Sequence, residues 1–396
     1  MTVLGVALRY LRGRWVATAL SGVSVALGVG LVLASSLLAR GIEKAFVEGA
    51  TDYSLIVGAK GSPVQLVLSV VFRMDTATPN ILRVTYDHLA SDPRVEVAVP
   101  VALGDAYQGF RYVATSPAYF AAFPWRRKSF TVTAGRFFRP DAPEDPGYEV
   151  VLGAEAARRT GLRLGDRFFE GEEMAEFPLR VAGILRPTRS ADDRAIFLSL
   201  PSFWGMNEIA RKMQMKPLTA VLVRPKRMSD LPALHRQLNI AQETQAVFPS
   251  AVLLGIFNLL GLAEEALALI LAIVAIVVGL YLFVSMYSAT LERTREIATM
   301  RALGARRATI LAIVLLESCV VTLVGGCAGV VLGHGVAYAG AQLLAVRAGV
   351  VADPFAMGAL QPLVVAGVVL LGALAGLLPA LSAYRVDVEA NLAPLS

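Results

Sequence analysis

The 396-residue sequence has few cysteines and little charge. Its two cysteines, Cys319 and Cys327, lie eight positions apart in one apolar segment. On a helix rising about 1.5 Å per residue they would be roughly 12 Å apart, which is too far for a disulfide. Charged residues make up 17% of the chain, below the roughly 25% of soluble domains. With 56% hydrophobic residues and a mean hydropathy of +0.59, the composition excludes an ordinary soluble protein.

Motifs for nucleotide binding, metal binding and catalysis are also missing. The segment "GAKGSP" at 58–63 contains glycine and lysine, but its spacing is not that of a P-loop, so we expect no ATP site of that kind. His88, His235 and His334 are far apart in sequence and predict no metal centre. "GLRLGDRF" lacks the strand–helix context of a dinucleotide site, and no serine lies in a nucleophile-elbow pattern. We therefore predict no catalytic residue, no bound cofactor and no enzyme activity in this chain.

Long apolar runs account for the high hydropathy. Each of the four runs can supply the roughly 20 residues that a membrane-spanning helix needs. The predicted transmembrane helices cover residues 15–39, 266–290, 308–335 and 362–383. The sequence thus predicts a membrane protein with a four-helix transmembrane bundle and a large mixed α/β extracytoplasmic domain between helices 1 and 2.

The basic residues indicate the orientation of these helices. Arginines cluster before the first span, between the second and third, and after the fourth: Arg9, Arg12, Arg14, Arg293, Arg295, Arg301, Arg306, Arg307 and Arg385. By the positive-inside rule these regions and both termini are cytoplasmic, and residues 40–265 lie outside. The first run could be a cleaved signal peptide, but it exceeds the 7–15 residues of a signal h-region, which favours a retained helix.

The flanking segments have patterns of their own. Residues 1–14 predict a cytoplasmic amphipathic helix on the membrane face, with a plain tail as the alternative. The polar segment "ARGIEKAFVEGATD" and the segment "LLGLAEEALALI" predict that the first two spans continue as helices outside the membrane. Residues 384–396 form a cytoplasmic tail.

The outer segment predicts short strands bounded by Gly, Pro or Asp. These strands read "VEVAVPVAL", "FRYVAT", "SFTVTAG", "YEVVLG", "FPLRVAGIL", "AIFLSL" and "LTAVLVRP". A short helix at 154–160 should end at Gly161, and "LPALHRQLNIAQETQAVF" predicts one longer helix over 231–248. The cluster of strands suggests a subdomain over 130–225.

One outer segment, within residues 58–81, is apolar nearly all round. Ser62-Pro63 is a helix-start signal, and the apolar side chains that follow are Val64, Leu66, Val67, Leu68, Val70, Val71 and Phe72. Such a helix is either buried or in contact with lipid. A core helix is the favoured interpretation, because apolar helices are usually core. The alternative is a contact with the membrane or a lipidic substrate through Val64, Leu66, Val67, Leu68, Val71 and Phe72.

The third span carries an ionisable group and a glycine stripe. Glu317 is an intramembrane carboxylate and so a functional candidate, although without an obvious basic partner we favour a group bonded to a neighbouring helix or subunit. Glycines at four-residue spacing predict close helix packing in a tight bundle: Gly325, Gly329 and Gly333 here, and Gly372 and Gly376 on the fourth span.

The stretch "LERTREIATMRALGARR" at 291–307 concentrates charge between two apolar spans. Leu291, Ile297, Met300 and Leu303 can share one side of a helix, and Gly304 supplies a C-terminal stop. This pattern predicts a short cytoplasmic amphipathic helix. The alternative is a solvated loop that only orients the protein.

The segment "RTREIATMRALGARRATILAIVLLESCVVTLVGGCAGVVLG" strongly resembles the R-x-x-E-I-x-x-x-R-A-L-G-A motif of FtsX/MacB/LolC-type ABC transporter permeases, a four-span mechanotransmission family. The match extends to Glu317 and the glycines after it. The ending "LPALSAYRVDVEANL" is similar to the family's, although Val386-Asp387-Val388 replaces its usual proline region. "AGRFF", "EVVLGAEAARRTGLRLGDRF" and "FPLRVAGIL" resemble the MacB-like extracytoplasmic domain. The resemblance is least clear over 52–125.

The resemblance implies a permease subunit that binds a separate ABC ATPase and couples its ATP hydrolysis to movement of the periplasmic domain. Residues 291–307 would be the coupling helix, with the ATPase-coupling residues Glu292, Arg293, Arg295, Glu296, Arg301, Leu303 and Gly304. ATP and Mg would bind in the partner ATPase, and this chain would hold no cofactor. Further implied partners are a second permease copy or paralogue in a dimer, a periplasmic adaptor or substrate-binding protein, and membrane lipid, but no nucleic acid.

Two roles within the family stay open, in a multi-pass protein of the bacterial inner (cytoplasmic) membrane. The first is export, or the handling of lipoproteins or lipids. The alternative is an FtsX-like signalling scaffold that activates a periplasmic cell-wall hydrolase. A membrane enzyme is a third hypothesis, without a catalytic constellation to support it. The substrate is not indicated.

Overall fold

The computed structural model describes residues 3–74, 79–123, 129–139, 148–169, 178–188, 190–206, 216–348 and 360–384. The chain divides into two compact units. The first contains residues 1–41, 261–341 and 353–396, and the second contains residues 42–260 and 342–352. Each unit is described by itself.

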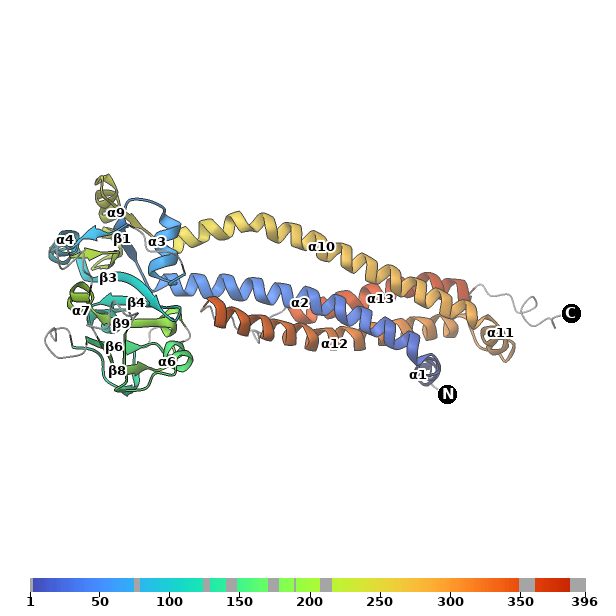
Figure 1. Cartoon of the computed structure of the whole chain (residues 1–396). Coiled ribbons are helices and arrows are strands. Elements are labelled where there is room, and N and C mark those ends of the chain that lie inside the picture. The colour runs from blue at the N-terminus through green and yellow to red at the C-terminus, as the bar shows by residue number, and fades with distance from the viewer. Residues whose placement is uncertain are drawn as a thin grey trace. The chain divides into compact units, whose positions relative to one another are not determined.

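The first unit is helical (Figure 1). Its elements are α1 (Val3–Gly13), α2 (Trp15–Thr51), α10 (Pro249–Glu292), α11 (Thr294–Ala302), α12 (Arg307–Ala348) and α13 (Leu360–Tyr384). Among the described residues, four helices are long and apolar enough to cross a membrane, over Trp15–Thr51, Glu265–Glu292, Arg307–Leu344 and Gln361–Leu381. The prediction of four membrane helices is confirmed. As predicted from the polar flanks, α2 continues to Thr51 and α10 begins at Pro249, well outside their apolar parts.

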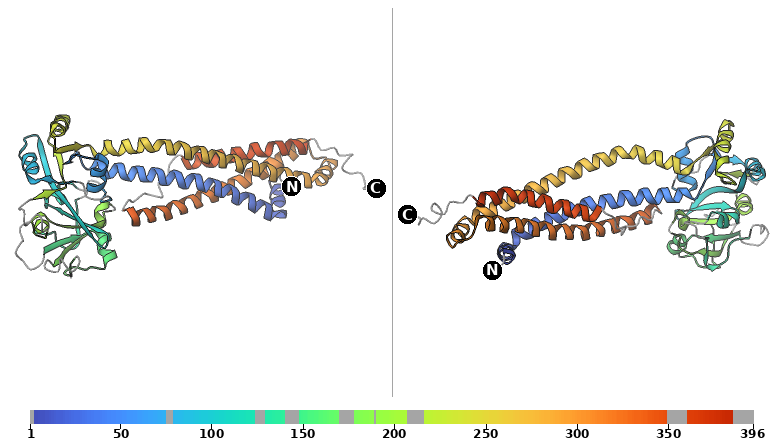
Figure 2. Two further views of the ribbon diagram at one scale, coloured as in Figure 1. Left: turned by 45° about the horizontal axis from the view of Figure 1, so that its top comes forward. Right: turned by 180° about the vertical axis from the view of Figure 1, so that it is seen from behind.

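Glycines bring three of these helices into close contact (Figures 1 and 2). A Cβ atom on Gly329 of α12 would lie 2.6 Å from the Cβ of Val29 on α2, so only glycine fits there. On α13, a Cβ atom on Gly376 would lie 2.4 Å from the Oγ of Ser318 on α12. Gly325, Gly333 and Gly372 are similarly crowded by a neighbouring helix. The prediction that these glycines allow close packing is confirmed.

In the part of the second unit that the structure describes, ten strands form one mixed sheet in the order β12-β1-β11-β3-β4-β9-β6-β8-β5, with β7 pairing β8. Its strands are β1 (Leu55–Ala59), β3 (Val95–Tyr107), β4 (Phe110–Thr115), β5 (Val132–Gly135), β6 (Tyr148–Leu152), β7 (Arg167–Phe168), β8 (Leu179–Leu185), β9 (Ala195–Ser199), β11 (Ala220–Pro225) and β12 (Thr244–Val247). A separate pair joins β2 (Ile81–Leu82) to β10 (Pro217–Leu218). Two neighbouring pairs, β4 with β9 and β6 with β8, are parallel.

Helices cover both faces of this sheet. On one face, Leu89 of α4 (Arg83–Ser91), Ala156 of α6 (Ala154–Thr160) and Leu234 of α9 (Leu231–Ile240) join one hydrophobic core, to which α7 (Leu200–Met206) adds Leu200 and Met206. On the other face, a second core contains side chains from α3 (Pro63–Val70), from α5 (Ala118–Ala122) and from the ends of α2 and α10 that belong to this unit. The mixed α/β class predicted for the outer segment is confirmed.

All seven strands named from the sequence are present, with β5 reduced to four residues. The helix ended by Gly161 is also present, with Gly161 in the left-handed conformation at φ +74°. The single helix predicted over 231–248 is wrong in its second half. It ends at Ile240, and residues 244–247 form β12, whose partner is β1. Pairing with a strand nearly 190 positions earlier is a long-range contact that overrides the local helical pattern.

The strands over 130–225 belong to one continuous sheet with the rest of the unit. The strands β5, β6, β8 and β9 pair with one another, whereas β11 pairs with β1 and β3 in the other half. The subdomain over 130–225 stays a prediction.

Candidate functional site

The charged stretch between the second and third spans forms a helix, α11, that follows α10 after a single residue, Arg293. The helix ends at Ala302, and the predicted stop, Gly304, follows the C-cap Leu303 with φ +97°. The Gly304 N–H donates to the carbonyl of Arg301 and the Ala305 N–H to that of Met300, both at 3.0 Å. This pair of hydrogen bonds is a Schellman cap, which satisfies carbonyls left open at a helix end. The chain can therefore turn sharply from α11 into α12.

The apolar side of α11 packs inside the first unit. Ile297 forms a small core with Ile310 and Val314 of α12 and Ala380 of α13, and Met300 packs against it. The other side of α11 is open. Leu303 is 84% exposed, and Arg295, Glu296 and Gly304 are exposed as well. This side of α11 therefore presents one apolar side chain and several charged ones to solvent.

Arg293 has a different environment from the exposed residues of this segment. Its Nη1 lies 2.8 Å from Oε1 of Glu317 on α12, with the two side chains 14% and 5% exposed. Its guanidinium also stacks over the ring of Tyr10 on α1, 4.3 Å from the centroid, and its Nη2 donates to the Tyr10 carbonyl at 3.4 Å. The Arg293 side chain thus connects the end of α10 to α12 and to α1.

Glu317 is therefore bonded to a neighbouring helix, as favoured from the sequence, and its basic partner is Arg293. A carboxylate within a membrane span is costly unless it is paired. The sequence signal was too weak to identify this pair, because the two residues are 24 positions apart and meet only through helix packing.

The amphipathic helix α1 and the residue after it also contact the region around Arg293. Arg14, just after α1, forms a 2.7 Å ion pair with the more exposed Glu292 at the end of α10. The Tyr10 hydroxyl lies 3.8 Å from the sulfur of Met300 on α11. Burial and the nearby charge of Glu296 raise the pKa of Tyr10. The sequence does not indicate Tyr10 and Arg14 as parts of this site, because aromatic and basic residues are both common in a basic amphipathic helix.

Of the seven predicted coupling residues, five are exposed and two are partly covered. Glu292, Arg295, Glu296, Leu303 and Gly304 lie on the open side, whereas Arg293 and Arg301 are half-buried. Contacts with another protein by any of these residues stay a prediction.

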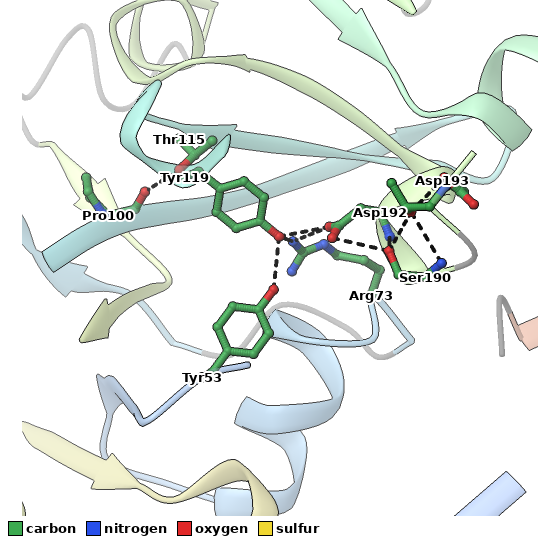
Figure 3. Close-up of polar contacts among 9 residues, drawn as sticks. Tyr53, Arg73, Pro100, Thr115, Tyr119, Ser190, Asp192 and Asp193 are labelled. Carbon is green, nitrogen blue, oxygen red and sulfur yellow. Dashed lines mark hydrogen bonds and ion pairs between the residues drawn. The ribbon is translucent and has the colours of Figure 1, made fainter. Parts of the chain in front are cut away.

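The second unit contains a buried polar cluster (Figure 3). The side chains of Arg73 and Asp192 are 3% and 7% exposed and form a 3.2 Å ion pair. The hydroxyl of Tyr119 donates to Oδ1 of Asp192 at 2.9 Å and lies 3.1 Å from the hydroxyl of Tyr53. Burial, followed by the charge of Asp192, raises the pKa of both tyrosines. Arg73 has a left-handed backbone, at φ +59°, which costs a non-glycine residue about 1 kcal/mol or more.

This cluster fixes the end of the apolar segment that begins at Ser62. As predicted, Ser62 caps α3, its side chain accepting from the Gln65 N–H at 3.3 Å. The side chains of Leu66, Val67, Val71 and Phe72 are at most 7% exposed and belong to the core. They contact other core side chains, whereas Val64 is 37% exposed and Leu68 is half-buried. A contact of this segment with a membrane or a substrate stays a prediction. The burial agrees with the favoured interpretation of a core helix.

Four apolar helices, an α/β domain between the first two and a short charged helix between the second and third define a class of polytopic membrane subunit. Residues 18–241 match the family described as MacB-like periplasmic core domain, and residues 268–388 match the FtsX-like permease C-terminal family. The first match alone covers more than half of the chain. The chain therefore belongs to the MacB/FtsX-type family of ABC transporter permeases.

Named relatives agree with this family. The macrolide export ATP-binding/permease protein MacB of Azoarcus sp. (strain BH72) is 26% identical over 349 residues, covering 84% of this chain and 51% of that protein. The uncharacterized ABC transporter permease YknZ of Bacillus subtilis (strain 168) is 40% identical over 99 residues, covering 24% of this chain and 23% of that protein. This chain spans about half the length of the MacB protein it matches.

A solved structure resembles part of the chain. The periplasmic region of MacB from Actinobacillus actinomycetemcomitans aligns with a TM-score of 0.37 at 13% identity, over 55% of this chain and 95% of that chain.

Proposed function

We propose that this chain is the permease subunit of an ABC transporter in a bacterial inner membrane, with both termini cytoplasmic. In this proposal, ATP hydrolysis by an ABC ATPase that binds α11 moves the periplasmic domain. ATP and Mg bind in that ATPase. A second permease copy completes a dimer, and the work done is export or the handling of a lipoprotein or lipid.

The observation that supports this most directly is the two-sided character of α11. One side presents Leu303, Arg295 and Glu296 to solvent, and the other packs on α12 and α13 through Ile297. A helix held firmly on one side and open on the other can receive a force and pass it on. The ion pair of Arg293 with Glu317 also connects this segment to α12, and the contact of Arg293 with Tyr10 connects it to α1.

A second observation concerns α10, which connects to α11 through one residue. It is one uninterrupted helix of 44 residues, about 66 Å long at 1.5 Å per residue. Its first residues belong to the second unit, where Leu253 lies in the core. A displacement of α11 therefore has a continuous covalent and hydrogen-bonded path into the domain outside the membrane.

The test is ATP hydrolysis by the assembled transporter in lipid vesicles. We expect Leu303→Asp and the double change Arg295→Ala/Glu296→Ala to reduce ATPase stimulation by this chain about tenfold or more, because each removes part of the open side of α11. Arg227→Gln, an exposed charge in the second unit, is the matched control and should change nothing. Full stimulation in both α11 variants would contradict the assignment.

A further inference from the structure

The second unit contains a pocket of about 410 Å³ at the point where the parallel strands β4 and β9 both end. Thr115 and Ser199, the last residues of these strands, are in register and both line it. Pockets of about 300–1,000 Å³ are the usual size for small molecules, and the carboxyl ends of parallel strands are a common place for them.

Aromatic and aliphatic side chains form the walls of this pocket. Tyr86 of α4, Leu200 and Trp204 of α7, and Leu218 of β10 line it. The indole ring of Trp204 is fixed, because its Nε1 donates to the carbonyl of Pro217 at 3.0 Å. A wall that is fixed before a ligand arrives loses little conformational entropy on binding.

The hydroxyl groups at the bottom of the pocket already have partners inside the protein. The Thr115 hydroxyl donates to the Pro100 carbonyl at 2.9 Å (Figure 3), and the hydroxyl oxygens of Ser199 and Ser202 are 2.8 Å apart. Thr115 and Ser199 are 1% and 4% exposed. An apolar ring can cover these satisfied hydroxyls without leaving a buried polar group unpaired.

Two basic side chains lie at the Trp204 wall of the pocket: Arg83, which lines the pocket, and Lys216, which is not among the lining residues. The Arg83 guanidinium carbon and the Lys216 Nζ each lie 5.8 Å from the centroid of the Trp204 ring. None of the described lining residues is acidic. Asp87 is 3.5 Å from Arg83, but both side chains are about half exposed, so this pair is weak in water and leaves Arg83 able to bind an anion.

We propose that this pocket binds an amphipathic organic anion. Its flat apolar body lies against Trp204 and Tyr86, and its anionic group is held by Arg83 and Lys216. The size of the pocket limits the ligand to one small molecule or one terminal group of a larger one. Binding at this site requires no ATPase, so the proposal stands or fails separately from the function proposed above.

The test uses the full chain in lipid nanodiscs and titration calorimetry with naphthalene-2-sulfonate, a flat aromatic anion. We expect saturable binding of one molecule per chain, above the signal of empty nanodiscs. The neutral analogue 2-naphthylmethanol should bind at least about fivefold more weakly, since it lacks the anionic group. Absence of saturable binding, or equal affinity for the neutral analogue, would overturn the proposal.

Substitutions locate the site. Trp204→Ala should weaken naphthalene-2-sulfonate binding about tenfold or more, whereas Trp204→Phe should keep most of it, because a ring still forms the wall. Arg83→Gln/Lys216→Gln should weaken binding of the sulfonate but leave the neutral analogue unchanged. The controls are Phe169→Ala, which removes an aromatic ring that is 54% exposed elsewhere in the unit, and Arg227→Gln. Binding that survives Trp204→Ala, or that falls equally in the controls, places the ligand elsewhere and refutes the assignment.

Discussion

At the scale of single residues, two kinds of arginine occur in the charged stretch between α10 and α12. Arg295 is exposed, whereas the side chain of Arg293 is only 14% exposed and packs against Glu317 and the ring of Tyr10. Breaking a buried ion pair by removing one partner leaves an unpaired charge, which is far more costly than losing an exposed charge. Stability and coupling can therefore be separated by choosing the right arginine.

The first prediction compares these two arginines. Arg293→Ala should lower the free energy of unfolding of the chain in nanodiscs by about 3–5 kcal/mol, because Glu317 loses its partner. Arg295→Ala should change it by less than about 0.5 kcal/mol. Thermal unfolding measures both, and the double change Arg293→Ala/Glu317→Ala should recover part of the loss. Equal effects of the two single changes would contradict the role of the buried pair.

A second prediction concerns Glu149 of β6. Burial alone would raise its pKa, but hydrogen bonds from Arg136, the Arg139 N–H and Arg180 outweigh burial and hold the pKa below its ordinary value. A lowered pKa in the folded state stabilises the protein above the unfolded pKa of about 4.3, and this stabilisation is lost as the pH falls through the folded pKa. At neutral pH, Glu149→Gln should therefore unfold at a lower temperature than the unaltered chain.

The pH dependence of that difference is the measurement. The gap in unfolding temperature between Glu149→Gln and the unaltered chain should shrink as the pH falls below about 4.3. Glu96→Gln changes an exposed carboxylate and should show no gap at any pH. A gap for Glu149→Gln that stays constant down to pH 3 would exclude the lowered pKa.

At the scale of elements, glycine decides which helices touch. Gly329 faces Val29 and the Ala26 carbonyl on α2, whereas Gly335, six positions later on α12, has nothing within 4 Å of where its Cβ would be. In a membrane, association of helices depends on close packing rather than on a hydrophobic effect between them. The contact of α2 with α12 thus requires glycine, which has no side chain, at the positions where the two helices meet.

The third prediction uses this matched pair. Gly329→Ala should destabilise the bundle by about 1–3 kcal/mol, because its Cβ would lie 2.6 Å from that of Val29 and would push α2 and α12 apart. Gly335→Ala should be neutral or slightly stabilising, since alanine favours helices. Unfolding temperatures in identical nanodiscs distinguish them, and the same result for both would refute the close contact.

Local patterns predicted the elements well and their partners poorly. The apolar runs, the Ser62 cap and the Gly304 stop are local signals, and each was found in the structure. The sequence assigns β12 to the end of a helix and does not indicate β1, because β1 pairs with β11 and β12, which are both distant along the chain. The partner of Glu317 was missed for the same reason.

At the scale of the whole molecule, two continuous helices link the two units along the chain. The helices α2 and α10 each run without a break from the helical unit into the unit that contains the sheet. The ends of both helices contribute core side chains there, Ala50 from α2 and Leu253 from α10. The central claim is that a partner ATPase acts on this continuous path at α11.

Site-specific photocrosslinking from position 303 tests that claim most directly. A benzophenone amino acid would replace Leu303, with Ile240, which is 75% exposed in the second unit, as the control position. In native membranes we expect position 303 to yield an adduct whose second protein is identified by mass spectrometry as an ABC ATPase with a P-loop, and position 240 to yield none. No ATPase adduct from position 303, or one of equal yield from position 240, would contradict the account.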